Sequence, residues 1–161
     1  MNQLTQTPNN AGAVVIDANV LVSICSKEPS HQTAAAALAD YAAKNWAFYA
    51  PGAILTEVLF ILCKKRQDGL LTEAEHEAAV RTFDDYMQGI QPSPEGDIRF
   101  ILRNEELRKG YSCLHSADAF YLALTEELAK SGAAEFLTFD KRAVNVAANN
   151  APSVKINLLP S

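Results

Sequence analysis

The stretch Ala13-Val14-Val15-Ile16-Asp17 is the clearest indication of how this chain folds. It is a short, continuous apolar run rich in β-branched residues, which is typical of a strand buried on both faces of a parallel sheet. Further along the chain, short apolar segments with strand character alternate with longer segments of helical period. This alternation requires crossover connections. The sequence therefore predicts an α/β fold with a mostly parallel central sheet and helices on both faces.

The rest of the chain can be divided into elements on the same principle. Strands are predicted at 46–50, 135–139 and 154–158, and helices at 33–44, 53–66, 72–88, 97–109 and 116–130. A helix with Asn19 as its N-cap is expected after the first strand, and a short helix after Asp140. Thr72-Glu73-Ala74-Glu75 fits a capping box. We expect residues 1–12 to form a loose arm and residues 13–161 a single domain.

Composition narrows the classes of function. The chain has 161 residues, 48% of them hydrophobic and 20% charged, which suffices for one sizeable core. A net charge of −5 argues against a sequence-reading DNA-binding module, because such modules carry basic surfaces. A nuclease stays open, since metal ions can supply positive charge locally. The N-terminus lacks the pattern of a secretory signal, and no apolar stretch approaches the roughly 18–20 residues of a membrane span. We therefore expect a cytoplasmic protein without a membrane partner.

Two acids directly follow predicted strands. Asp17 directly follows the apolar run 13–16, and Asp140 directly follows the run 136–139. In parallel sheets, sites form beyond the carboxyl ends of the strands. Thr138 and Asp140 lie on the same side of an extended backbone, which places a hydroxyl beside a carboxylate. The alternative is that both acids only cap the turns or helices that follow them.

Two further acids lie in apolar helical segments. Glu57 has Ile54 and Ile61 as neighbours at helical spacing, and Asp118 stands in an apolar and aromatic stretch that runs to Leu124. A carboxylate buried in such surroundings is strongly unfavourable unless a cation or strong donors hold it. The alternatives are an ion pair for Glu57 and, for Asp118, stabilisation by the start of its helix.

Taken together, the four acids indicate a metal site. Without a cation they would repel one another, and some would stay protonated at neutral pH. Mg²⁺ or Mn²⁺ removes this conflict, because carboxylate oxygens are the natural ligands of hard divalent cations. A water bound to such a cation can attack a phosphodiester. We interpret the acids as a hydrolytic site.

These motifs resemble the PIN-domain family. The resemblance rests on Val15-Ile16-Asp17-Ala18-Asn19-Val20, Thr56-Glu57-Val58, the segment 116–124 and Leu137-Thr138-Phe139-Asp140, and it covers residues 13–159. The order and spacing of the acids are similar to those of small bacterial VapC-type toxins. The resemblance implies a metal-dependent ribonuclease with a three-layer α/β/α sandwich. It further implies a homodimer that a cognate antitoxin protein neutralises.

The resemblance also implies roles for single residues. The catalytic and metal-binding acids would be Asp17, Glu57, Asp118 and Asp140, with Asp17 and Asp118 closest to the first metal. Hydrogen bonds from Asn19 and Thr138 would support them.

Three further residues are candidates for contact with RNA: Lys141, Arg142 and His115. The first two follow Asp140 and are suited to the phosphate backbone, and His115 is close to Asp118 in sequence. A solvated helix face is the alternative for the basic pair, and a helix-start or packing role is the alternative for His115.

We hypothesise an endoribonuclease that uses Mg²⁺ or Mn²⁺ and acts as the toxin of a toxin–antitoxin pair. One alternative is a non-catalytic interaction module whose acids form ion pairs. The other is an Asp-based phosphoryl-transfer domain, although the dehalogenase type has a second Asp where this chain has Asn19. The helix 72–88 carries Ala79, Phe83, Tyr86 and Met87 on part of its surface, which can face either the core or a groove for a partner helix.

Overall fold

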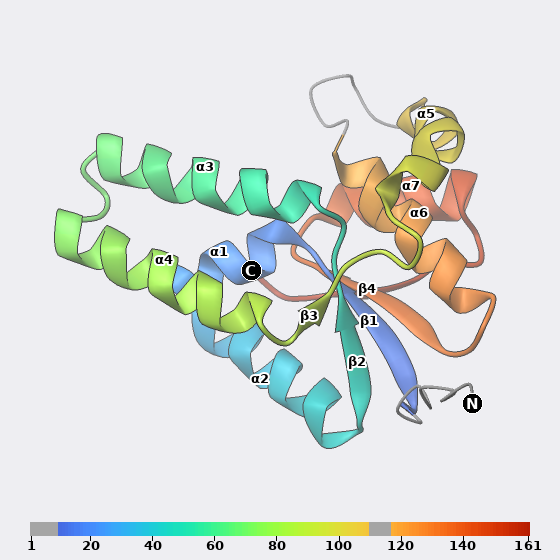
Figure 1. Cartoon of the computed structure of the whole chain (residues 1–161), viewed down its shortest axis with the longest axis horizontal. Helices are drawn as coiled ribbons and strands as arrows, with labels where there is room; N and C mark the ends of the chain where they lie inside the picture. The colour runs from blue at the N-terminus through green and yellow to red at the C-terminus, as the bar shows by residue number, and fades with distance from the viewer. Residues whose placement is uncertain (1–9, 110–116) are drawn as a thin grey trace, which may run out of the picture.

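The computed structural model describes residues 10–109 and 117–161 and folds them into helices around one sheet (Figure 1). Along the chain the elements are β1 (Gly12–Ile16), α1 (Ala18–Cys25), α2 (His31–Ala43), β2 (Trp46–Tyr49), α3 (Ala53–Gln67), α4 (Glu73–Met87), β3 (Ile90–Gln91), the 3₁₀ helix η1 (Asp97–Phe100), α5 (Ile101–Arg108), α6 (Asp118–Ala129), β4 (Ala134–Thr138), α7 (Lys141–Asn150) and β5 (Lys155–Leu158). Within the described ranges, no helix has the length and hydropathy needed to cross a membrane.

The sheet is parallel throughout, with the strand order β3-β2-β1-β4-β5. Strand β1 is central: Ala13 lies opposite Ala47 of β2 on one side and Ala134 of β4 on the other. The chain builds outward from β1 through β2 to β3, and then returns to add β4 and β5 beyond the other side of β1. The order therefore reverses between β1 and β4, which is the position where α/β sheets of this kind form their sites.

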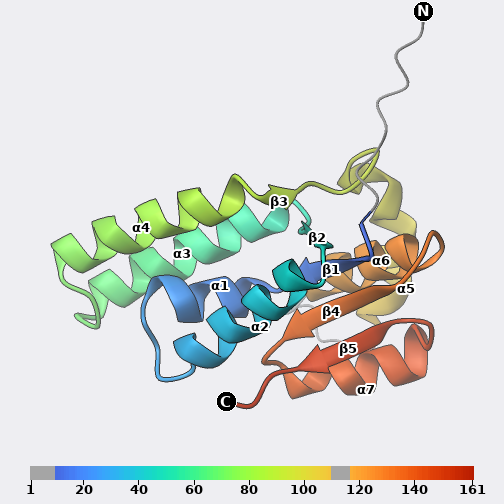
Figure 2. The same cartoon turned by 90° about the horizontal axis from the view of Figure 1, so that it is seen from below.

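The helices form a layer on each face of the sheet. Right-handed crossovers place the helices that join β1, β2 and β3 on one face and those that precede β4 and β5 on the other. On the first face, α2 contacts β2 and α1, while α3 and α4 pack on each other and on α1 (Figures 1 and 2). On the second face, α6 packs on β1 and β4, and α7 packs on β5. The α/β/α sandwich implied by the resemblance is confirmed.

The core surrounds the central strand. Val14, Val15 and Ile16 are each at most 1% exposed, so successive side chains are buried on opposite faces of β1, as its apolar run predicts. On β4, Phe136 and Leu137 are equally buried. Because both central strands end in buried residues, the backbone at their carboxyl ends is held firmly in place.

Most of the predicted elements are confirmed, including the capping box, in which Thr72 accepts from the backbone N–H of Glu75. The predicted N-cap is wrong: Asp17 holds that position, and Asn19 lies inside the first turn of α1. The helix predicted at 97–109 begins as a 3₁₀ turn. The short strand β3 was not predicted, because two residues are too few to show a period. Residues 1–9 of the predicted arm lie outside the described residues, and Gly12 belongs to β1.

Truncating a core side chain tests this account of the packing. Leu137→Ala removes a side chain with no exposed surface, so we expect the free energy of unfolding to fall by about 2–5 kcal/mol. Leu102→Ala is the matched control, because Leu102 is 81% exposed and its loss should change stability by no more than about 0.5 kcal/mol. Urea denaturation of both variants checks the prediction, which equal losses would contradict.

Candidate functional site

Asp17 is the most buried of the predicted site acids. Strand β1 ends just before it, and its backbone N–H donates to the carbonyl of Leu137 in β4, at 3.0 Å. The residue is only 8% exposed. Its Oδ2 accepts hydrogen bonds from the amide of Asn19, at 2.9 Å, and from the hydroxyl of Thr138. The carboxyl group is thus fixed between the ends of the two central strands.

Asn19 and Thr138 also connect to each other. The Asn19 amide donates to Thr138 Oγ1 at 3.2 Å, and Asn19 Oδ1 accepts from the backbone N–H of Phe139 at 3.2 Å. Thr138 Oγ1 accepts a further bond from the backbone N–H of Asp140, at 2.9 Å. These bonds cross from α1 to the end of β4. They fix the orientation of the Asp17 carboxyl group and link the first turn of α1 to the residues that follow β4.

Burial and neighbouring acids make Asp17 a weak acid. The pKa of Asp17 is raised to about 7: burial is the largest cause, the Thr138 hydroxyl opposes it, and the charges of Asp118 and Glu57 add to the rise. The three acids therefore lie within electrostatic reach of one another, although they come from different parts of the chain. This is the repulsion between carboxylates that the sequence predicted.

Glu57 reaches this region from α3 and is partly buried. Its Oε2 accepts a hydrogen bond of 2.5 Å from the hydroxyl of Tyr121. Burial raises the pKa of Glu57, the Tyr121 hydroxyl lowers it, and the charge of Asp118 raises it again. Asp118 is the first residue of α6 and is also partly buried. The partner of Glu57 is therefore a tyrosine hydroxyl and not the Lys or Arg of the ion pair considered above. In the sequence, Tyr121 is recognisable only as an aromatic neighbour of Asp118.

Asp140 is held differently from the other acids. It is the N-cap of α7, and its carboxylate accepts from the backbone N–H of Arg142 at 2.9 Å. The Arg142 guanidinium also binds both of its oxygens, at 2.8–3.0 Å. In this structure Asp140 therefore acts as a helix cap, as the alternative interpretation of its sequence position expected. Lys141 and Arg142 are exposed at the start of α7, and His115 lies outside the described residues.

The donors at this edge of the sheet suit a hard divalent cation in type. They are carboxylate oxygens, and burial followed by mutual charge raises the pKa of both Asp17 and Glu57, a shift that a bound cation would oppose. In the described part of the chain, however, no three His, Cys, Asp or Glu side chains are grouped closely enough to hold a metal as they stand. The acids therefore have the right chemistry for a cation but do not form a complete set of ligands as they stand, and Arg142 binds both oxygens of Asp140.

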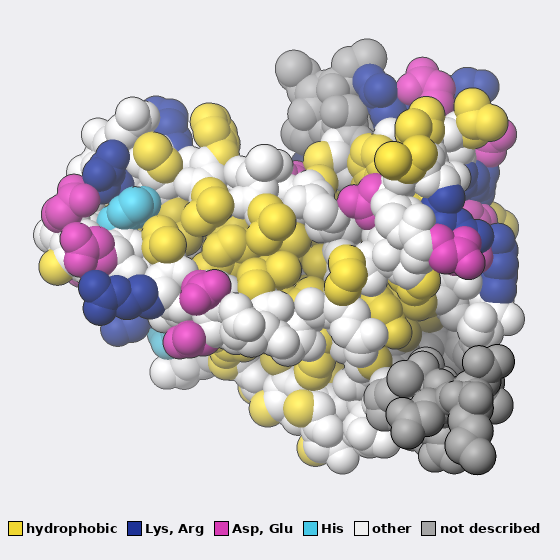
Figure 3. All heavy atoms as spheres, viewed as in Figure 1, with side chains coloured by type: hydrophobic (Ala, Val, Ile, Leu, Met, Phe, Trp, Pro, Cys, Tyr) yellow, Lys and Arg dark blue, Asp and Glu magenta, His cyan; other side chains and the backbone are white. Residues whose placement is uncertain are grey.

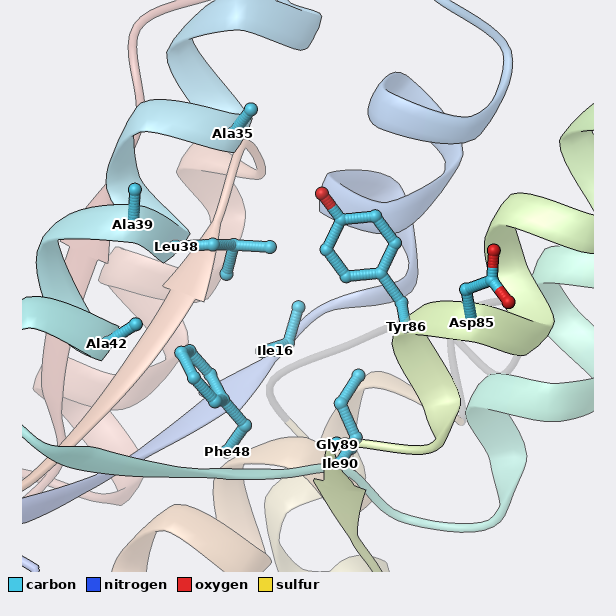
Figure 4. A pocket seen from close by; sticks show the side chains of 10 residues that line it. All are labelled: Ile16, Ala35, Leu38, Ala39, Ala42, Phe48, Asp85, Tyr86, Gly89 and Ile90. Carbon is cyan, nitrogen blue, oxygen red and sulfur yellow. The ribbon is translucent and has the colours of Figure 1, made fainter.

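A second feature is an apolar hollow of about 390 Å³ between α2 and α4 (Figure 4). Its floor comes from the sheet, and its walls come from small and aliphatic residues of α2 and from the end of α4. It is lined by Ile16, Ala35, Leu38, Ala39, Ala42, Phe48, Asp85, Tyr86, Gly89 and Ile90. Of the residues singled out on the helix 72–88, Ala79 and Phe83 are in the core, whereas Tyr86 lines the hollow. The sequence analysis did not predict that α2 lines a hollow, because its alanines indicate only that the segment is helical.

A protein family and a solved structure resemble this chain. The model of the PIN domain family matches residues 14–149. No curated protein matches the sequence. A chain in the crystal structure of VapBC2 from Rickettsia felis, bound to a DNA fragment from their promoter, is similar in structure, with a TM-score of 0.60 and 14% sequence identity. The match covers 92% of this chain and 99% of that one. At this identity the likeness supports the fold alone.

The raised pKa of Asp17 predicts how stability depends on pH without metal. In the unfolded chain Asp17 loses its proton near its ordinary pKa of about 4, and in the folded chain near 7. The folded state binds more protons between these values, so the free energy of unfolding falls as the pH rises through this window. The expected fall is on the order of 3 kcal/mol.

Asp17→Asn should remove most of that fall and make the protein more stable than wild type at pH 7.5. Urea denaturation in chelator at pH 4.5 and pH 7.5 measures the effect. Asp40→Asn is the control, because Asp40 is an exposed acid paired with Lys44. A wild-type pH slope in Asp17→Asn would contradict the prediction.

Proposed function

The chain belongs to the PIN-domain family, and on this premise we propose that it is a metal-dependent endoribonuclease that hydrolyses RNA phosphodiesters. The observation that carries the proposal is the buried Asp17 carboxyl group, within electrostatic reach of Glu57 and Asp118 at the point where the strand order reverses. A core without function would avoid three acids within electrostatic reach of one another, because each disfavours the charge of the others.

We assign Mg²⁺ or Mn²⁺ to this site, held by Asp17, Asp118 and Glu57, with Asp140 completing the set. When bound, the cation supplies charge neutralisation at the phosphodiester and lowers the pKa of water for hydrolysis. Asn19 and Thr138 keep the Asp17 carboxyl group in one orientation. Arg142 releases Asp140 and, together with Lys141, binds the RNA backbone, for which its half-exposed guanidinium is suited.

One observation favours the alternative of a non-catalytic module. Asp140 already has a guanidinium partner, which is the arrangement expected if the acids serve only in ion pairs. Titration with Mn²⁺ in a calorimeter separates the two hypotheses. Binding that depends on Asp17 and Asp118 supports the nuclease, whereas a module without catalytic function would bind no Mn²⁺ at these acids.

Substitution of the central acids tests the catalytic assignment. Asp17→Asn and Asp118→Asn should each lower the rate of RNA cleavage in Mg²⁺ or Mn²⁺ by about a hundredfold or more, because they remove charge that holds the cation. A chelator should abolish the wild-type activity. Asp40→Asn should cleave at the wild-type rate, since Asp40 lies on the exposed face of α2. The measurement is the initial rate on a labelled RNA, and equal rates in all four proteins would remove the assignment.

We also propose that the protein is the cytoplasmic toxin of a toxin–antitoxin pair. The hollow between α2 and α4 supports a docking site for an apolar segment of the antitoxin, because small side chains allow a helix to approach closely. The carboxylate of Asp85 at its border suits a basic side chain of that segment (Figure 4). Ile16, which directly precedes Asp17 in the chain, is one of the residues that line the hollow.

A charge placed in the hollow tests this docking site. Ala39→Glu should weaken the complex with the antitoxin encoded by the adjacent reading frame at least about tenfold, because it buries a carboxylate against an apolar partner. Ala148→Glu is the matched control, since Ala148 lines a different apolar hollow, beside β5. Copurification followed by calorimetry gives the two affinities. If both variants bind like wild type, the hollow is not the docking site.

A homodimer is part of the same proposal. Large apolar side chains are exposed on α3 and near the start of α5, among them Phe60, at 69%, and Leu102, at 81%. Figure 3 shows apolar side chains gathered over the α3–α4 pair and over the region of α5. Exposed apolar patches of this kind mark association surfaces. They support the second copy that the resemblance implies.

A further inference from the structure

Tyr121 is a completely buried residue whose hydroxyl points at the proposed site. It lies on α6 one turn after Asp118 and has no exposed surface. Its hydroxyl donates to Glu57 Oε2 at 2.5 Å, across from α6 to α3. Its ring stacks on Phe136 of β4, with the centroids 5.7 Å apart and an angle of 27° between the planes. The ring of Tyr121 is therefore packed in the core, and its hydroxyl is hydrogen-bonded to an acid of the proposed site.

The hydroxyl is not required for packing. A phenylalanine would fill nearly the same volume, and a buried tyrosine hydroxyl is unfavourable unless it finds a partner. Here the partner is a carboxylate of the proposed site rather than a backbone carbonyl of the core. The bond engages one oxygen of Glu57, and a carboxylate has a second oxygen that can bind another ligand.

Glu57 needs such a partner more than Asp17 does. Its longer side chain can adopt more rotamers, so fixing it for ligand binding carries a larger loss of entropy. Asp17 is already oriented by the Thr138 hydroxyl. Glu57 receives its own hydroxyl from Tyr121. The two acids are thus held by the same kind of bond, one from the end of a strand and the other from a helix.

We propose that Tyr121 is a positioning residue, whose hydroxyl holds the Glu57 carboxylate in the orientation from which it binds the divalent cation. This inference rests on the proposed function. Groups that orient metal ligands in this way contribute about 10–100-fold to metal affinity. A purely structural tyrosine would contribute to folding stability and leave metal affinity unchanged.

Tyr41 provides a matched control within the same chain. It is also buried, on α2, and its hydroxyl also donates to a glutamate, Glu135. That glutamate lies in β4 and is paired with Lys155 rather than placed among the site acids. Tyr41→Phe therefore removes a buried phenol–glutamate bond of the same chemistry without touching the site.

The experiment measures Mn²⁺ binding by calorimetry and thermal unfolding for the wild type, Tyr121→Phe and Tyr41→Phe. We expect Tyr121→Phe to weaken Mn²⁺ binding about tenfold and Tyr41→Phe to change it by less than about twofold, whatever their effects on melting temperature. In a Glu57→Gln background, Tyr121→Phe should cause no further loss, because the residue acts through Glu57.

Three results would overturn the inference while leaving the proposed function intact. They are wild-type Mn²⁺ affinity in Tyr121→Phe, an equal loss in Tyr41→Phe, and an undiminished loss in the Glu57→Gln background. If Tyr121→Phe does not fold, Glu57→Gln is the remaining test: wild-type Mn²⁺ affinity there overturns the inference, because Tyr121 acts only through Glu57, and a loss of affinity is the result that the inference requires. If the wild type itself binds no Mn²⁺, the proposed function fails, and this inference fails with it.

Discussion

The Asp17 carboxyl group is buried at the end of the central strand, and the arrangement of its neighbours follows from that burial. A carboxyl group in that position must be hydrogen-bonded, and it must be either neutral or balanced by positive charge. Asn19 and Thr138 meet the first requirement, and in doing so they join α1 to the end of β4. Burial and the charges of Asp118 and Glu57 raise the pKa of Asp17, so without a cation the second requirement is met by a bound proton. The proposed cation would take the place of that proton.

The topology explains how acids so far apart in sequence come together. Strands β1 and β4 are neighbours because the chain returns to the centre of the sheet after building β2 and β3. Asp17 and Asp140 follow these two strands, while α3 and α6 bring Glu57 and Asp118 to the same edge. One residue of β1, Ile16, also lines the apolar hollow between α2 and α4. Catalysis and antitoxin binding, as proposed, would therefore both involve residues at the end of one strand.

Local patterns were the reliable part of the prediction. Val14 to Ile16 indicate a strand buried on both faces because every position of the run is apolar, and the capping box at Thr72 is contained in four residues. Errors arose where local signals compete. Asn19 has the side chain of an N-cap, but the helix begins at Ala18, and Asp17, two residues before Asn19, takes that position. The two residues of β3 form a strand only because β2 lies beside them.

The α/β class can be predicted from the amino-acid sequence, as can the acids at strand ends or among apolar residues, because strand and helix periods and the unfavourable burial of charge are visible in a single chain. Which donor binds which acid is set by tertiary packing. Tyr121 binds Glu57, and Arg142 binds Asp140, because helices packed on the sheet bring those groups within hydrogen-bond distance. The hollow between α2 and α4 depends likewise on how two helices are spaced over the strands, a distance that no local pattern encodes.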